Sequence, residues 1–264
     1  MDLQLKDKRA LVSGSTAGIG LAIATALARE GAAVVINGRT RPRVEQAVAA
    51  VGRAVPGAKV TGVAADLASA AGVAVLLREV PAADVVVNNL GIFEAKPFAD
   101  ISDDDWRRFF ETNVLSGVRL SRAYLPGLLQ RNWGRVVFIS SESAINIPSE
   151  MIHYGVTKTA QLAVARGLAE LTVGTGVTVN SVLPGPTKSE GVGSFVADLA
   201  RSGKKTPAQV EAEFFQEMRP TSLLRRFATP EEVAALVAFV CSPLASAVNG
   251  AALRVDGGVV RSVI

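Results

Sequence analysis

The pair Tyr154 and Lys158 has the residue types and the spacing needed for proton transfer at neutral pH. On a helix, residues four apart share one face, so the ammonium would lie beside the phenol. A free phenol has a pKa of about 10 and is a poor base at pH 7. At about 4 Å and an effective dielectric constant of about 20, the ammonium stabilises the phenolate by roughly 4 kcal/mol. We therefore expect Tyr154 to act as a general acid/base whose pKa is lowered by Lys158.

Two serines precede this pair in the sequence and could supply a second hydroxyl. Ser140 and Ser141 directly follow the apolar run of residues 136–139. A hydroxyl at the end of that run could hydrogen-bond a substrate oxygen while Tyr154 moves its proton. Because a tyrosine four residues before a lysine also arises by chance on helices, this interpretation depends on the rest of the chain.

A glycine-rich segment near the N-terminus has the surroundings of a phosphate site. The apolar residues 10–13 predict a strand, and residues 21–29, rich in Ala and Leu, predict a helix. The free N–H groups of a helix N-terminus attract anions, and glycines let the backbone approach a pyrophosphate closely. The spacing Gly-x3-Gly-x-Gly differs from the standard dinucleotide fingerprint, and a plain tight turn is the alternative. We favour phosphate binding by Gly14, Ser15, Thr16, Gly18, Ile19 and Gly20.

The elements between these motifs alternate. Near-continuous apolar strands separated by helices predict a parallel sheet covered on both faces. Strands are expected at residues 33–36, 59–64, 84–87, 135–139, 177–182 and 251–255, and helices at residues 41–51, 72–79, 103–129 (one helix or a broken pair) and 153–172. The sequence therefore predicts an α/β fold, a Rossmann-type doubly wound parallel sheet of about seven strands in one domain, residues 1–264.

The pattern loosens over residues 188–228, where glycines and lysines interrupt short apolar pieces. Ligands of such sheets bind outside the carboxyl ends of the strands, and this insertion follows one of them. A helical lid over the substrate is predicted, with a plain surface insertion as the alternative. Candidate pocket residues are Ser143, Ile145, Glu150, His153, Phe195, Phe214 and Met218, although His153 is one helical position away from Tyr154 and should make a polar or pocket-rim contact.

The composition argues against several other functions. Lys and Arg exceed Asp and Glu by 28 − 24 = 4 but form no basic run, so nucleic-acid binding is not expected. Cys241 is the single cysteine, which forbids an intramolecular disulfide and suits a reducing cytosol, and its apolar neighbours predict a packed, inert thiol. With one histidine, His153, a metal site is not expected. No secretion signal or stretch of membrane-spanning length is present, so a cytoplasmic protein is predicted.

The ordered motifs together resemble the short-chain dehydrogenase/reductases, and in particular the 3-oxoacyl-carrier-protein reductase type. The resemblance covers nearly the whole chain, with motifs at family spacing from residue 13 to residue 258. The motifs are Ser13-Gly14-x3-Gly18-Ile19-Gly20, Asn88-Asn89-Leu90-Gly91, Asn113, Ser141, Tyr154-x3-Lys158 and Pro184-Gly185. Leu90 stands where the family usually has alanine, which removes no catalytic group.

The resemblance implies a role for each catalytic residue. Tyr154 would be the general acid/base, and Lys158 would lower its pKa and hydrogen-bond the nicotinamide ribose. Ser141, rather than Ser140, would orient the carbonyl, and Asn113 would hold a water that links Lys158 to solvent. The implied cofactor contacts are Gly14, Ser15, Thr16, Gly18, Ile19, Gly20, Arg39, Asp66, Leu67, Asn89, Gly91, Tyr154, Lys158, Pro184, Gly185 and Thr187.

The choice of nicotinamide cofactor depends on the end of the second predicted strand, residues 37–40. An NAD enzyme needs a carboxylate there to accept the adenosine ribose hydroxyls, and none is present. The guanidinium of Arg39 could bind a 2′-phosphate, Gly38 leaves room for it, and Asn37 or Thr40 could add a donor. NADP is therefore expected and NAD is the less favoured cofactor, although Ala17 lacks the second basic residue that many NADP enzymes have.

The predicted function is reversible hydride transfer between NAD(P) and a small alcohol or ketone. A 3-oxoacyl-carrier-protein reductase is the alternative, but Thr175 stands where those enzymes commonly carry an arginine. The alternative from another class is a non-catalytic NADP-binding sensor or scaffold. The resemblance also implies a homotetramer or homodimer, with a seam formed by the helices around Gly117 and Ala165.

Overall fold

The computed structural model describes residues 2–189, 193, 201 and 205–263. These residues form a seven-stranded sheet in the order β3-β2-β1-β4-β5-β6-β7, in which all neighbouring strands are parallel. The strands are β1 (Arg9–Val12), β2 (Ala33–Gly38), β3 (Val60–Ala64), β4 (Val85–Asn88), β5 (Gly134–Ile139), β6 (Val177–Pro184) and β7 (Ala252–Val255). The predicted doubly wound parallel sheet is confirmed.

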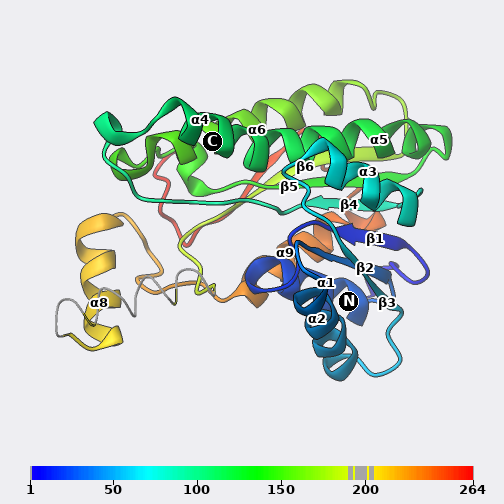
Figure 1. The fold of residues 1–264 in the computed structure, drawn as a ribbon, viewed down its shortest axis with the longest axis horizontal. Coiled ribbons are helices and arrows are strands. Elements are labelled where there is room, and N and C mark those ends of the chain that lie inside the picture. The colour runs from blue at the N-terminus through cyan, green and yellow to red at the C-terminus, as the bar shows by residue number, and fades with distance from the viewer. Residues whose placement is uncertain (1, 190–192, 194–200, 202–204, 264) are drawn as a thin grey trace.

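Helices cover both faces of the sheet (Figure 1). One face carries α1 (Gly18–Arg29), α2 (Arg41–Ala54) and α9 (Pro230–Val240), and the other carries α3 (Ala70–Glu79), α4 (Asp103–Phe109), α5 (Ser116–Gln130) and α6 (Ile152–Glu170). Every residue of β4, β5 and β6 is buried, because both faces of the sheet are covered. Helix α9 is not among the helices predicted from the sequence, although Thr229 and Glu232 form a capping box at its start.

The long segment predicted at residues 103–129 is a broken pair of helices. The π-helix η2 (Phe110–Leu115) joins α4 to α5 and contains Asn113. A π-turn widens the helix and is found most often at functional sites. Here it places Asn113 opposite α6, with the Asn113 Nδ2 atom 2.9 Å from the Thr157 hydroxyl.

The described part of the predicted lid contains α8 (Pro207–Glu213) and the π-helix η5 (Phe214–Met218). In Figure 1, α8 projects away from the sheet. Phe214, Phe215 and Phe227 pack together with ring centroids 5.0–5.1 Å apart, which fixes the segment that follows η5. Phe195, a predicted pocket residue, lies outside the described residues, and the lid remains a prediction.

The small residues of the predicted subunit seam face the interior of this chain. A Cβ atom on Gly117 would meet Phe138 Cε1 at 2.7 Å, so this glycine allows α5 to pack against β5. Ala165 is buried in the cluster formed by α5, α6, β5 and β6. Gly117 and Ala165 thus pack inside this chain, and a subunit seam formed by the helices around them stays a prediction.

Candidate active site

The carboxyl ends of β1, β2 and β4 hold the glycine loop, residues 13–20, in a network of side-chain hydrogen bonds. The Ser13 hydroxyl donates to Val87 O and accepts from the backbone N–H groups of Asn89 and Leu90. The Asn89 amide donates to the carbonyls of Ser13 and Gly14 at 2.9 and 3.0 Å. The loop is therefore fixed in shape by residues of the motifs themselves.

The glycine loop has the form of a cradle for a dinucleotide. Gly14 has a φ of +60°, a conformation that favours glycine, and a Cβ atom on Gly20 would meet Asn89 Nδ2 at 2.5 Å. Helix α1 begins at Gly18 after Ala17, which offers no side-chain cap, so its first N–H groups are available to an anion. These features fit the pyrophosphate of a nicotinamide dinucleotide.

The end of β2 shows which groups are available beside this cradle. Arg39 is exposed, and it makes no ion pair or hydrogen bond with the residues that the structure describes. Asn37, by contrast, is buried, and its side chain bonds Gly14 N, Val63 O and Ala65 O. The prediction that Asn37 could add a donor for a phosphate is therefore wrong, because its amide already shapes the loop.

The remaining predicted cofactor residues lie along the same edge of the sheet. Asp66 is exposed after β3, and Leu67 beside it is buried in the core. Gly91 lies close to the catalytic groups, since a Cβ atom there would be 3.4 Å from Lys158 Nζ. Pro184, Gly185 and Thr187 follow one another at the end of β6 and line the cavity described below.

Helix α6 presents Tyr154 and Lys158 to the ends of β4 and β5. The Tyr154 phenol and the Ser141 hydroxyl both line the cavity. The Ser140 hydroxyl instead donates to the backbone carbonyl of Lys158 at 2.9 Å, which ties β5 to α6. This difference distinguishes the two serines, because the Ser140 hydroxyl is occupied by the main chain and Ser141 is the serine that acts on the pKa of the phenol.

The pKa values of the pair differ from the expectation drawn from the sequence. Burial raises the pKa of Tyr154 to about 12, although the Ser141 side chain acts to lower it, and burial lowers the pKa of Lys158 to about 7. The ammonium does not stabilise the phenolate here, since Lys158 Nζ lies 5.6 Å from the Tyr154 ring centroid and donates to Ile139 O at 2.9 Å. In this structure Tyr154 is thus a phenol that keeps its proton at neutral pH.

Gln161 is a polar residue of this network that the sequence analysis did not identify. It is 1% exposed, accepts from Lys158 Nζ at 3.3 Å and donates through Nε2 to the main-chain carbonyl of Asn113. The Gln161 amide thus joins Lys158 to the main chain of Asn113, and the water that links Lys158 to solvent stays a prediction. Its position, three residues after Lys158 on α6, was the available signal.

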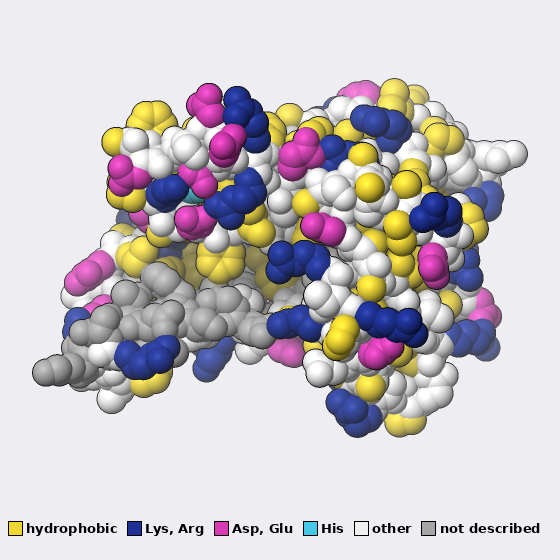
Figure 2. Space-filling view, in the orientation of Figure 1, with side chains coloured by type: hydrophobic (Ala, Val, Ile, Leu, Met, Phe, Trp, Pro, Cys, Tyr) yellow, Lys and Arg dark blue, Asp and Glu magenta, His cyan; other side chains and the backbone are white. Residues whose placement is uncertain are grey.

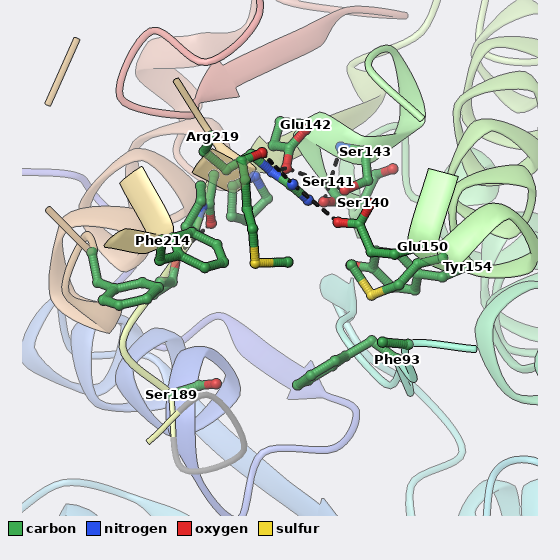
Figure 3. Close-up of a pocket in the computed structure, with 18 of the residues that line it drawn as sticks. Phe93, Ser140, Ser141, Glu142, Ser143, Glu150, Tyr154, Ser189, Phe214 and Arg219 are labelled. Carbon is green, nitrogen blue, oxygen red and sulfur yellow. Dashed lines mark hydrogen bonds and ion pairs between the residues drawn. The ribbon is translucent and has the colours of Figure 1, made fainter. Parts of the chain in front are cut away.

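A cavity of about 410 Å³ opens beside Tyr154. Figure 2 shows hydrophobic side chains in a recess of this face, and Figure 3 shows Phe214 and Tyr154 on opposite sides of the cavity. Its apolar lining includes Phe93, Met151, Phe214, Met218 and Phe227. Four predicted pocket residues line it: Ser143, Glu150, Phe214 and Met218.

The polar side of the cavity contains an ion-pair cluster, which we call the polar wall: Glu142, Arg219 and Glu150. Arg219 Nε lies 3.0 Å from Glu142 Oε1, and Arg219 Nη1 lies 3.2 Å from Glu150 Oε1 (Figure 3). Burial raises the pKa of Glu142, and the Arg219 guanidinium opposes that rise. Glu150 is a predicted pocket residue, whereas Glu142 and Arg219 are not; a carboxylate directly after Ser141 is the only local signal in the sequence.

Two predicted pocket residues do not line the cavity. His153 is fully buried between Trp106 and Phe109, with its ring centroid 4.0 Å from that of Phe109. Neither ring nitrogen has a hydrogen-bond partner among the residues that the structure describes. The expected polar contact of His153 is wrong, and burial lowers its pKa. Ile145 is exposed and lies outside the lining.

Cys241 is packed in the hydrophobic core, as its apolar neighbours predict. Cys241 is buried and its pKa is raised to about 12, as expected for an inert thiol. The described residues contain no cluster of three or more metal-ligating side chains, and none of their helices is long and apolar enough to cross a membrane.

Comparison with known proteins places this geometry in a family. The family model described as enoyl-(acyl carrier protein) reductase matches residues 14–260. The chain belongs to the short-chain dehydrogenase/reductase family. The predicted family is confirmed, and with it the class of reaction: this short-chain dehydrogenase/reductase is an NAD(P)-dependent oxidoreductase that interconverts alcohol and carbonyl groups.

Relatives within the short-chain dehydrogenase/reductases cover the whole chain. The chain is 51% identical to the uncharacterized oxidoreductase YvaG of Bacillus subtilis (strain 168), over 100% of both proteins. It is 33% identical to a D-beta-hydroxybutyrate dehydrogenase of Cupriavidus necator, over 96% of this chain and 98% of that protein. Its fold matches the L-sorbose reductase of Gluconobacter frateurii, solved with NADPH and L-sorbose, with a TM-score of 0.94, 30% identity and full coverage of both chains.

Proposed function

We propose that this enzyme uses NADPH to reduce the ketone group of a small molecule bound in the cavity beside Tyr154. The observation that carries the proposal is the presence of two hydroxyl side chains, Ser141 and Tyr154, on the wall of one cavity. Two hydroxyls on one wall can both approach a single carbonyl oxygen. Lys158 and Asn113 complete the set behind the phenol.

The protonation state of Tyr154 suits it to be a proton donor. NADPH supplies the hydride when it is bound in the glycine loop. Because the pKa of Tyr154 is raised to about 12, the phenol keeps its proton until negative charge develops on the substrate oxygen. Ser141 would hold that oxygen by a hydrogen bond, and Lys158, buried next to Gly91, would contact the cofactor on the far side of the phenol.

The preference for NADPH rests on the end of β2. Arg39 is exposed without a partner among the described residues, and no carboxylate stands at positions 37–40. A guanidinium binds a 2′-phosphate through paired charged hydrogen bonds. The binding of NADPH by the L-sorbose reductase of similar fold supports the same choice.

The proposal also covers the other cofactor contacts, the segment over the cavity, the location of the enzyme and its assembly. We assign the adenosine contacts to Asp66, Leu67, Asn89 and Gly91, the nicotinamide contacts to Pro184, Gly185 and Thr187, and a covering role to residues 188–228. A cytoplasmic enzyme that assembles as a homodimer or homotetramer is proposed as well. A carrier-protein substrate is less favoured because of Thr175, and the sensor or scaffold alternative has no lost catalytic group to support it.

Tyr154→Phe tests the proposal directly. The variant should lose kcat by about 10²–10⁴-fold in ketone-dependent NADPH oxidation, because a positioned general acid contributes that much. NADPH affinity, measured by fluorescence titration, should change little, since the hydroxyl faces the cavity. Ketone reduction at the wild-type rate by the variant would refute the assignment of Tyr154.

A further inference from the structure

The polar wall has hydrogen-bonding groups that its own ion pairs leave open. Arg219 Nε donates to Glu142, and Arg219 Nη1 donates to Glu150 and to the main-chain carbonyl of Met218. Arg219 Nη2 has no hydrogen-bond partner among the described residues. Glu150 uses Oε1 only, and its side chain is 33% exposed. An open N–H donor and an open carboxylate acceptor therefore lie side by side on the cavity lining.

A hydroxyl group fits this pair of open sites better than other groups. It can accept a hydrogen bond from Arg219 Nη2 and donate one to Glu150, which neither a carboxylate nor an ammonium can do. The wall also lies next to the reacting hydroxyls, because Glu142 follows Ser141 in the chain and Glu150 is four residues before Tyr154. A substrate hydroxyl on the wall would thus be close to the reacting carbonyl.

The charge of the lining disfavours anionic substrates. Among the described lining residues, Glu94, Glu142 and Glu150 are acidic, and Arg219 is the one basic residue. Arg219 is already shared between two carboxylates, and Glu142 is buried with an unpartnered Oε2. Whether Glu142 is ionised or protonated, the polar wall has no net positive charge to offset a bound carboxylate.

We propose that the polar wall selects neutral ketones that carry hydroxyl groups near the carbonyl, and that it rejects ketones bearing a carboxylate. The inference rests on the proposed function and specifies its substrate class. The apolar lining of the cavity, which includes Phe93, Phe214 and Met218, would pack against the carbon chain of such a molecule. Glu142 holds Arg219 in place, and Arg219 and Glu150 make the hydrogen bonds that recognise the substrate hydroxyl.

Three six-carbon ketones separate charge from hydroxylation. D-Fructose is neutral and hydroxylated, 5-keto-D-gluconate has hydroxyls and a carboxylate, and 2-hexanone has neither. With NADPH and the purified enzyme, kcat/KM for D-fructose, or for L-sorbose in its place, should exceed that for each of the other two by about tenfold or more. A preference for 5-keto-D-gluconate or for 2-hexanone would overturn the proposal.

Glu150→Gln tests the wall itself, because it removes one negative charge and keeps an acceptor oxygen. The ratio of kcat/KM between the neutral ketose and 5-keto-D-gluconate should fall by about tenfold, mainly through a gain for the carboxylate. Glu217→Gln is the matched control, since Glu217 is exposed on the same π-helix as Met218 and does not line the cavity. An unchanged ratio in Glu150→Gln would refute the role of the wall.

Binding to an inactive enzyme distinguishes this proposal from the proposed function. Calorimetry on the NADP⁺ complex of Tyr154→Phe measures ketone affinity without turnover. Tighter binding of the neutral ketose than of 5-keto-D-gluconate supports the wall even if the assigned catalytic role of Tyr154 fails. Equal or reversed affinities refute the wall even if ketones are reduced.

Discussion

The glycine loop and the polar wall satisfy their polar groups in different ways. In the loop, the side chains of Ser13, Asn37 and Asn89 bond the backbone of neighbouring strands, so the cradle is rigid before any ligand binds. In the wall, Arg219 Nη2 has no partner among the described residues, and Glu150 pairs with Arg219 through Oε1 alone. The cofactor side is thus preorganised by its own hydrogen bonds, while the substrate side retains groups that a ligand can use.

Because the glycine loop is rigid, we expect the largest effect from a side chain added there, and we expect that effect on NADPH binding. In Gly20→Ala, the new Cβ atom would meet Asn89 Nδ2 at 2.5 Å and Gly14 O at 2.6 Å. NADPH binding should weaken by about 100-fold, because the cradle must distort to make room. Fluorescence titration measures this, and Gly52→Ala, a helix position with nothing within 4 Å, should bind NADPH normally. Equal affinities of the two variants would contradict a rigid cradle.

An intermediate effect, on kcat/KM for NADPH, is expected from substitution of Arg39, which is exposed at the end of β2. Arg39→Leu should lower kcat/KM for NADPH by about 10–100-fold, the value of one or two charged hydrogen bonds, and leave NADH within about twofold. Arg41→Leu is the control, because Arg41 is also exposed but pairs with Glu45 at 2.8 Å. Gly38 is kept in both variants, since a Cβ atom there would meet Thr16 Cγ2 at 2.4 Å. Equal losses with both cofactors would contradict 2′-phosphate binding by Arg39.

The smallest effect should come from Gln161, which links Lys158 to Asn113 behind the reacting groups. The pKa of Lys158 is lowered to about 7, and the Gln161 oxygen, as an acceptor, favours the ammonium. Gln161→Leu should lower the pKa of Lys158 further and move the inflection of kcat/KM for NADPH to lower pH by about one unit. Gln161→Glu should raise the pKa of Lys158 and move the inflection to higher pH by about one unit. The pH profiles of the three enzymes measure this order; identical inflections would show that Gln161 does not position Lys158.

Much of the fold and of the catalytic set followed from local sequence. The strands were predicted because a parallel sheet with both faces covered needs continuous apolar runs, and residues 84–87 and 135–139 are such runs. The glycine loop was predicted because tight turns and helix starts depend on residues next to one another. Tyr154 and Lys158 were paired from their spacing alone, and the structure places them on one helix as expected.

Features that join distant segments were not predicted. The polar wall brings together residues 142, 150 and 219, and no periodicity relates Arg219 to Glu142 across 77 positions. Helix α9 was missed because its apolar positions suit a packed segment of either type, and its capping box went unused. His153 was expected at a polar contact, but the packing of α4 against α6 encloses it between Trp106 and Phe109.

The sequence alone thus determined which chemical groups this enzyme has and the order in which strands and helices present them. Only the tertiary structure decided the electrostatic state of those groups. Burial acts on a side chain through everything packed around it, so it raised the pKa of Tyr154 and lowered that of Lys158, against the expectation from their spacing. The same dependence on distant neighbours determined which serine meets the phenol and which charges line the cavity.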